Sequence, residues 1–313
     1  MSETSKPKLT AAIPCYNQAH LLVGQLAAFA QQDYQPLEIL LLDDGSTDAT
    51  TSIMQSFCDT FPHARILDKQ PNQGVIAALN RLVDEATGDY IICSAADDQV
   101  QPGMFSALMD CAIRFPQCGL VFCDTICEGQ GRREVKSFGL APETTYFPPE
   151  AIVEHYRSEA VPWIPGNATM WNRQRLIEVG KYRPELGAMC DFLPCWLLAF
   201  RYGTGYVPAP LAAYTVNDDT WSAQRRRDTV AYQESYRRLI NVILSEECAD
   251  VRALFKRSRV LCRSIWPFLP LVETGQLFNM MEPSDVDAIS RLWTNYTLAT
   301  AQAEASTTDI AAD

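Results

Sequence analysis

The stretch YIICSAADDQVQP, residues 90–102, places two adjacent carboxylates, Asp97 and Asp98, between a run of β-forming residues and a proline that leads a helical pattern. Open α/β sheets bind ligands in the crevice outside the carboxyl ends of their strands, which is where this pair would lie. Paired carboxylate oxygens are suitable ligands for a hard divalent cation. The alternative is a solvated Asp-Asp turn, and the surrounding sequence argues against it.

Short apolar runs alternate with helical patterns in the first part of the chain, at residues 9–14, 37–42, 65–68, 89–94 and 119–124. The run LEILLL, residues 37–42, is continuous, as in strands of a parallel sheet that are buried on both faces. After the first run, apolar residues recur at helical spacing, among them Leu21, Leu22, Leu26 and Phe29. This alternation predicts an α/β fold with a mostly parallel sheet, flanking helices and right-handed crossovers.

Polar residues follow three of the predicted strands: Tyr16 and Asn17 after the first, Asp43 and Asp44 after the second, and the Asp97–Asp98 pair after the fourth. In a parallel sheet these ends face one crevice. Tyr16 offers an aromatic ring that can stack on a base, and Asp44 can accept a hydrogen bond from a ring N–H. For Asp43 we expect a structural role in the turn.

The composition argues against several classes of function. The chain of 313 residues has a formal net charge of −12, whereas nucleic-acid-binding proteins present basic faces. No GxGxxG follows the first strand and no GxxxxGK[ST] occurs, so dinucleotide-binding and P-loop functions lose their main support. If the crevice binds a nucleoside diphosphate, its phosphates would then be held by a metal ion and not by a glycine-rich loop. Because the sequence has no signal-peptide pattern and no long uncharged apolar window, we expect a cytosolic protein.

Five segments, in this order and spacing, resemble the family 2 glycosyltransferases of GT-A fold: AAIPCYNQ, LLDDGSTD, NQGVIAALN, ATGDYI and SAADDQVQPG. The resemblance extends over roughly residues 8–215. It implies a nucleoside-diphosphate-sugar donor, with a UDP-sugar favoured, bound together with Mg²⁺ or Mn²⁺. It also implies a glycan, lipid-linked or small-molecule acceptor with a free hydroxyl, and a role in bacterial surface or extracellular glycan synthesis.

The resemblance implies roles for individual residues. Asp98 would bind the metal, and Asp191 would be the base that deprotonates the acceptor hydroxyl in a single inverting displacement. The acceptor side would include Trp163, Gly166 and Asn167. The nucleotide would contact Pro14, Tyr16, Asn17, Asp44, Asn72 and Asp97.

Three residues depart from the family pattern. Ala95 stands where many members have the first aspartate of a D-x-D, Leu79 where an arginine is frequent, and Cys190 where the presumed base often has an acidic neighbour. These departures leave open a non-catalytic module that binds a nucleotide sugar. A nucleotidyltransferase would need a Gly-rich basic loop after its first strand, and CYNQAH does not supply one. Because the QxxRW signature of processive synthases is absent, we expect one transfer per encounter.

The chain is predicted to have disordered ends at residues 1–7 and 301–313, a GT-A domain over residues 8–222 and a helical C-terminal region over residues 223–300. In the helical region, Lys256, Arg257, Arg259 and Arg263 precede apolar residues between 265 and 269. This segment could rest on an anionic membrane surface at the inner membrane face. The alternative is a helix that packs on the catalytic domain or on a second subunit.

Overall fold

The computed structural model describes residues 6–129, 132–158, 164–215 and 228–261. Its strands are β1 (Leu9–Cys15), β2 (Leu37–Asp43), β3 (Ala64–Leu67), β4 (Tyr90–Cys93), β5 (Asp98–Val100), β6 (Leu120–Gly129), β7 (Arg132–Lys136), β8 (Thr145–Phe147), β9 (Thr169–Asn172) and β10 (Thr204–Thr215). Its α-helices are α1 (Ala19–Ala30), α2 (Thr50–Thr60), α3 (Val75–Glu85), α4 (Met104–Arg114), α5 (Pro149–Ser158), α6 (Arg173–Glu178), α7 (Phe192–Tyr202), α9 (Thr229–Leu244) and α10 (Arg252–Ser258). Short 3-10 helices are η1 (Gly166–Ala168), η2 (Pro184–Met189) and η3 (Glu246–Cys248).

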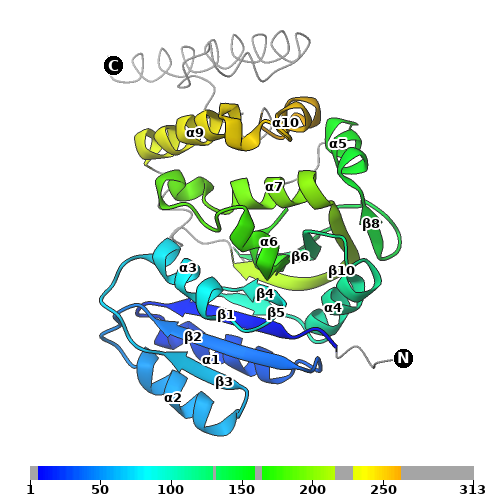
Figure 1. Ribbon diagram of the computed structural model, residues 1–313. Coiled ribbons are helices and arrows are strands. Elements are labelled where there is room, and N and C mark those ends of the chain that lie inside the picture. Colours follow the sequence, from blue (N-terminus) through cyan, green and yellow to red (C-terminus); the bar gives the residue numbers. More distant parts are fainter. Residues whose placement is uncertain (1–5, 130–131, 159–163, 216–227, 262–313) are drawn as a thin grey trace, which may run out of the picture.

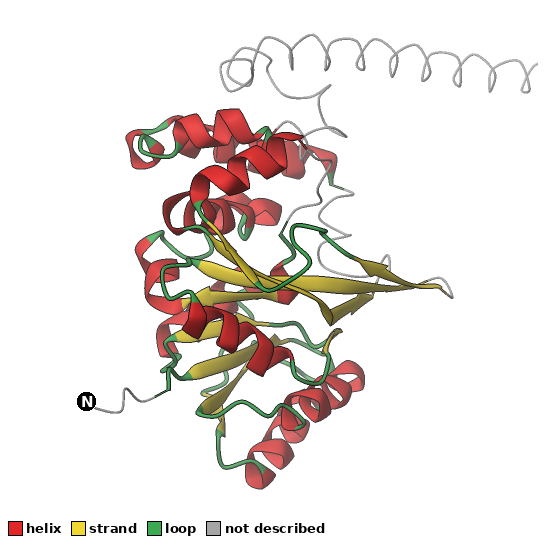
Figure 2. Cartoon of the chain, turned by 90° about the vertical axis from the view of Figure 1, so that its right-hand side faces the viewer, coloured by secondary structure: helices red, strands yellow, loops and turns green. Residues whose placement is uncertain are grey.

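The described strands form one sheet with the order β3-β2-β1-β4-β9-β6-β10-β5, while β7 pairs with β6 and β8 with β10. The pairs β1–β2, β2–β3, β1–β4 and β6–β10 are parallel. Helices cover both faces of the sheet, and α9 and α10 form a further layer beyond α7 (Figure 1 and Figure 2). The predicted α/β fold with a mostly parallel sheet and flanking helices is confirmed.

The side chains of β2 divide the hydrophobic core into two clusters. Leu40 and Leu42 belong to the cluster that includes residues of α3 and α7, and Ile39 and Leu41 to the one that includes residues of α1, α2 and α4. Successive residues of a strand point to opposite faces, so a continuous apolar run is suited to a sheet covered on both sides. The predicted double-sided burial of residues 37–42 is therefore confirmed.

The strand β9 was not predicted, and it separates the fourth and fifth predicted strands. It lies between β4 and β6 and is antiparallel to both. One further correction concerns the first helix. Leu21 is 37% exposed although it follows the helical spacing. The N-cap of α2 is Ala49, and the side chain that bonds the first turn is Asp48, which accepts the Thr50 N–H at 2.9 Å.

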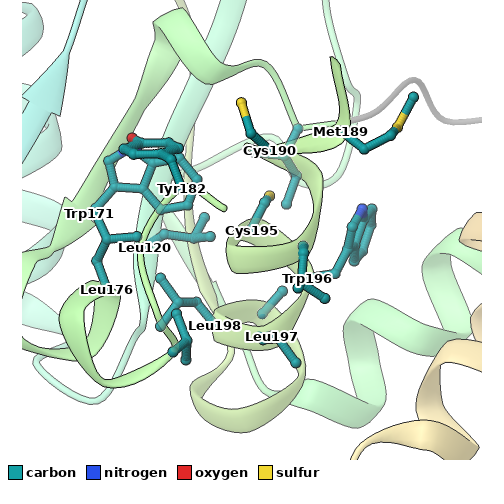
Figure 3. Close-up of a cluster of buried hydrophobic side chains, with 14 of the residues drawn as sticks. Leu120, Trp171, Leu176, Tyr182, Met189, Cys190, Cys195, Trp196, Leu197 and Leu198 are labelled. Atoms are coloured by element: carbon teal, nitrogen blue, oxygen red, sulfur yellow. The ribbon is translucent and has the colours of Figure 1, made fainter. Parts of the chain in front are cut away.

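The C-terminal helices pack on the α/β part of the chain. Tyr236 and Leu239 of α9 and Phe255 of α10 are buried in the same apolar cluster as α7, part of which is drawn in Figure 3. The rings of Phe200 and Phe255 meet edge to face with 4.9 Å between centroids. Arg257, considered above for a membrane surface, instead forms an ion pair with Glu150 at 2.7 Å.

Some expectations fall on residues outside the described ranges. Among them are Trp163, Arg263, the apolar residues 265–269 and the C-terminal tail. Of the helices that are described, none combines the length and the apolar character needed to cross a membrane. The packing of α9 and α10 favours the alternative in which this region contacts the catalytic domain.

We predict that Gly203→Ala destabilises the fold more than Gly139→Ala. Gly203 ends α7 at φ 75°, and a Cβ there would overlap the carbonyl oxygen of Phe147. Gly139 has φ 62° but open space around it, so its substitution measures the backbone strain alone, about 1–2 kcal/mol. The clash at Gly203 should add roughly 1–3 kcal/mol. Urea denaturation of both variants checks this, and equal losses would contradict it.

Candidate active site

The loops after β1 and β2 are joined by Asn17. Its backbone N–H donates to Ser46 Oγ at 2.9 Å, and its Oδ1 accepts the N–H of Thr47 at 2.8 Å. Asn17 adopts φ 53°, a conformation in which asparagine is several-fold enriched. Next to it, Tyr16 is 46% exposed, whereas Pro14 is buried inside β1. The structure thus shows Asn17 organising the loops and Tyr16 presenting its ring at the edge of the sheet.

Asp43 is fully buried at the end of β2. It accepts the Ser46 N–H at 2.7 Å, bonds to Thr51, and forms an ion pair with Lys69 at 3.2 Å. Burial alone would raise its pKa, but these hydrogen bonds outweigh burial and hold the pKa of Asp43 below its usual value. The predicted structural role in the turn is confirmed.

Asp44 organises the loop before α3, a role that the sequence did not indicate. Its carboxylate accepts hydrogen bonds from Gln70 Nε2 at 2.6 Å, from the Gln73 N–H at 3.0 Å and from the Gly74 N–H at 2.9 Å. Asn72 is exposed in this loop and also accepts the Gly74 N–H, at 3.0 Å. Because a carboxylate has about four acceptor positions, Asp44 keeps about one for a ligand.

Asp97 lies in the turn after β4, and Asp98 is the first residue of β5. The Asp98 carboxylate accepts the Ala95 N–H at 3.0 Å and is hydrogen-bonded by the side chain of Asn167. Asn167 also donates to the Ala213 carbonyl of β10, at 3.4 Å. Burial, with the charge of Asp97 as a smaller contribution, raises the pKa of Asp98 to about 7. The charged form of Asp98 is therefore disfavoured in the protein alone.

A divalent cation would reverse this effect, because a nearby positive charge favours the ionised carboxylate. The described residues contain no group of three or more His, Cys, Asp or Glu side chains that could enclose a metal. Asp97 and Asp98 supply hard oxygen atoms, and Mg²⁺ is commonly held by one or two carboxylates together with phosphates and water. The residues present fit Mg²⁺ or Mn²⁺ in this role.

Asp191 is the N-cap residue of α7, but its side chain makes no capping hydrogen bond. The side chain is exposed, and the protein around it still displaces enough water to raise the pKa of Asp191. A Cβ added at Gly166 would lie 3.3 Å from Asp191 Oδ2. Asp191 thus has acceptor positions that no capping bond occupies, and it lies beside Gly166, which has no side chain to cover it.

The short helix η1 brings the two carboxylates into relation. Gly166 lies beside Asp191, while the next residue, Asn167, bonds to Asp98. Thr169 holds the start of this turn by donating to the Pro165 carbonyl at 2.6 Å. Sequence reasoning assigned Gly166 and Asn167 to the acceptor side and missed the contact between Asn167 and Asp98. Only the antiparallel placement of β9, which follows η1 directly, brings this turn to the sheet edge.

A model of the family described as "Glycosyl transferase family 2" matches residues 10–173, about half of the chain. The chain belongs to glycosyltransferase family 2. The matched residues include Asp44, Asp97, Asp98 and the η1 turn, whereas Asp191 lies beyond them.

Among curated relatives, this family 2 chain is 35% identical over 123 residues to the uncharacterized glycosyltransferase YibD of Escherichia coli, covering 38% of the chain and 36% of the relative. It is 36% identical over 94 residues to a PGL/p-HBAD biosynthesis glycosyltransferase of Mycobacterium bovis, covering 30% and 37%. The matched part thus spans little more than a third of these relatives.

Two solved structures show that this family 2 chain has the GT-A fold. Staphylococcus aureus TarS 1-349, in complex with UDP-GlcNAc, has a TM-score of 0.63 at 15% identity and covers 87% of this chain and 79% of its own. The mannosyltransferase PcManGT of Pyrobaculum calidifontis, in complex with GDP-Man and Mn²⁺, has a TM-score of 0.58 at 20% identity and covers 96% and 81%.

An apolar groove of about 650 Å³ lies away from this site, between α1 and α2. Val23, Ile53 and Phe57 are among its lining residues, and none of those residues is titratable.

We predict that Asp98→Asn changes how stability depends on pH. Folded Asp98 keeps its proton up to about pH 7, whereas an unfolded aspartate loses it near its ordinary pKa of 3.8. The folded state therefore binds more protons between these values, and the free energy of unfolding falls as the pH rises from about 4 to about 7. Asp98→Asn should remove this fall. The stability of the variant relative to the wild type should therefore be higher at pH 8 than at pH 4, by on the order of 1–3 kcal/mol.

Urea denaturation in EDTA at several pH values measures this difference. Asp43→Asn is the matched control, since the lowered pKa of Asp43 gives the opposite sign and its substitution should weaken the protein at pH 8. Parallel pH profiles for the wild type and Asp98→Asn would contradict the prediction.

Proposed function

We propose that this chain transfers a sugar from a nucleoside-diphosphate sugar, in the first place a UDP-sugar, to an acceptor hydroxyl. The observation that carries the proposal is the η1 turn, which bonds to Asp98 through Asn167 and lies beside Asp191 at Gly166. Adjacent residues, Gly166 and Asn167, therefore lie next to two carboxylates. Asp98 is suited to bind the donor's metal, and Asp191 is suited to accept the acceptor's proton.

On the donor side, the proposal is supported by solved neighbours, one in complex with UDP-GlcNAc and another in complex with GDP-Man and Mn²⁺. Tyr16 presents an exposed ring for a base, and Asp44 has acceptor capacity for a ring N–H. Asp98, with Asp97 next to it, would hold Mg²⁺ or Mn²⁺. When bound, such an ion offsets several kcal/mol of charge on the departing diphosphate.

On the acceptor side, Asp191 Oδ2 accepts the proton of the attacking hydroxyl. The hydroxyl oxygen forms a bond to the anomeric carbon, the bond from that carbon to the diphosphate oxygen breaks with its electron pair, and the configuration inverts. The raised pKa of Asp191 suits this role, because a base is most effective when its pKa lies nearer the working pH. Positioned base catalysis typically contributes about 10²–10⁴-fold in rate.

The departures from the family pattern do not disrupt these arrangements. Cys190 is buried in the apolar core. Its thiol is therefore not at the surface of the site, where other members have the acidic neighbour of the presumed base. Leu79 packs against the same apolar cluster. These placements support an enzyme over a non-catalytic binding module.

The acceptor we propose is a glycan, a lipid-linked glycan or a small molecule with a free hydroxyl, and the reaction we propose takes place in the cytoplasm, at the inner membrane face where the acceptor is lipid-linked. We further propose a role in bacterial surface or extracellular glycan synthesis, and the mycobacterial relatives are glycosyltransferases named for the biosynthesis of PGL/p-HBAD. The negative net charge of −12 supports a partner other than nucleic acid.

We predict that UDP with Mn²⁺ raises the melting temperature of the wild type and that Asp98→Asn abolishes the metal-dependent part. A ligand at about 100 times its Kd adds about 2.7 kcal/mol of stability, which a thermal-shift panel of UDP, GDP, dTDP and CMP resolves. Asp191→Asn should keep the shift and lose sugar transfer. Binding without transfer by the wild type would establish the binding module instead, and the absence of any shift would contradict both.

A second prediction concerns Gly166→Ala. The added Cβ would lie 3.3 Å from Asp191 Oδ2, in the space that the acceptor hydroxyl needs, so kcat/KM should fall about 10- to 100-fold. Gly24→Ala is the matched control, because a Cβ there meets open space. Nucleotide affinity should stay unchanged in both variants. Wild-type turnover in Gly166→Ala would exclude an acceptor position beside Oδ2.

A further inference from the structure

The segment that carries Asp191 is held from two sides. On the side of the catalytic domain, Asn80 of α3 forms two hydrogen bonds with the backbone of Tyr182: Nδ2 donates to the carbonyl at 2.6 Å, and Oδ1 accepts the N–H at 3.0 Å. Tyr182 lies two residues before η2, which leads to Asp191. This pair anchors the beginning of the segment to the nucleotide-side half of the molecule.

The C-terminal helices hold the same segment from the other side. Arg183, just before η2, forms an ion pair with Glu247 of η3. Arg201, at the end of α7, donates to Asp250 at 2.8 and 3.0 Å and to the Glu247 carbonyl at 2.9 Å. The residues around η3 therefore bind the chain both before and after Asp191.

Helix α9 contacts η2 at its tightest point, Gly187. This glycine has φ 49° and ψ −119°, and a Cβ there would lie 2.7 Å from Ser235 Oγ of α9. Nearby, Arg238 of α9 donates to the Glu185 carbonyl at 3.2 Å. The Gly187 carbonyl in turn accepts the N–H of Cys190, the residue before Asp191, at 3.1 Å. A single hydrogen bond thus links Gly187, which contacts α9, to the backbone of the residue before Asp191.

The side chain of Asp191 makes no capping hydrogen bond, and the backbone groups that act on its carboxylate are those of Asp191 itself and of Phe192. Its position is set by the backbone of η2 and by the first turn of α7. Building on the proposed function, we propose that α9 and η3 position the base for catalysis, with Ser235 and the Arg183–Glu247 pair as positioning residues. This gives the helices beyond the family-matched part of the chain a direct role in the chemical step.

The donor residues belong to other loops, so this support acts on kcat and leaves donor affinity unchanged. A displacement of about 1 Å in a catalytic group can reduce the rate by about 100-fold. Ser235→Leu places a larger side chain against Gly187 and should lower kcat roughly 10- to 100-fold, with the KM for the donor unchanged. Val230→Leu, at a position of α9 that is 74% exposed, is the control and should keep wild-type kcat.

A charge exchange tests the same inference with two variants at partly exposed positions. Arg183→Glu opposes Glu247 and should lower kcat, and the double variant Arg183→Glu with Glu247→Arg should recover most of it. Nucleotide thermal shifts, measured for every variant, show that the donor site is intact. These shifts also show whether Ser235→Leu fails to fold. In that case the Arg183→Glu variant and its double variant with Glu247→Arg decide whether the contacts position the base.

The outcomes separate this inference from the proposed function. If the wild type transfers no sugar, the proposed function fails and the inference fails with it. If the wild type is active but Ser235→Leu and Arg183→Glu retain its kcat, the positioning role alone is overturned. An unchanged kcat for Arg183→Glu, or a double variant that is no better than Arg183→Glu, likewise overturns the role of the ion pair.

Discussion

The burial of both faces of the central sheet is the constraint on which the rest of the structure depends. Strands such as β2 place successive side chains in two separate apolar clusters, and the polar groups of the candidate site lie where the strands end. Because β1, β2 and β4 run parallel, these ends lie at one edge. Asp44 and Asp98 are therefore brought together by the topology, although 53 residues of sequence separate them.

The carboxylates at this edge serve opposite purposes. Asp43 is stabilised in its charged form by Ser46, Thr51 and Lys69, and it fastens the turn. Asp98 and Asp191 have raised pKa values, so their charged forms are disfavoured by the folded protein. Groups of this second kind reduce stability unless a ligand or a proton satisfies them, which is common at functional sites. Under the proposed function, this difference in pKa separates Asp98 and Asp191, which act on the ligands, from Asp43, which is structural.

Under the proposed function, the C-terminal helices contribute to the site beyond the part of the chain that the family model matches. The family model ends at residue 173, yet Asp191 follows it, and the segment that leads to Asp191 is held by contacts from α3, α9 and η3. The base and the donor residues are consequently supported by different parts of the chain. Such separation allows the acceptor side to vary while the nucleotide side keeps its architecture.

The amino-acid sequence by itself determined the alternation of strands and helices, the two-sided burial of residues 37–42, the structural turn at Asp43 and the family, because apolar periodicity and turn residues act locally. It did not reveal β9, which is short and pairs antiparallel with strands far away in sequence. Only the tertiary structure decided that Asn167 bonds to Asp98, that Gly166 adjoins Asp191, that Asp44 organises residues 70–74, and that α9 packs on η2. The physical reason is that each of these contacts joins segments whose proximity depends on long-range strand pairing and helix packing, and no local pattern records it.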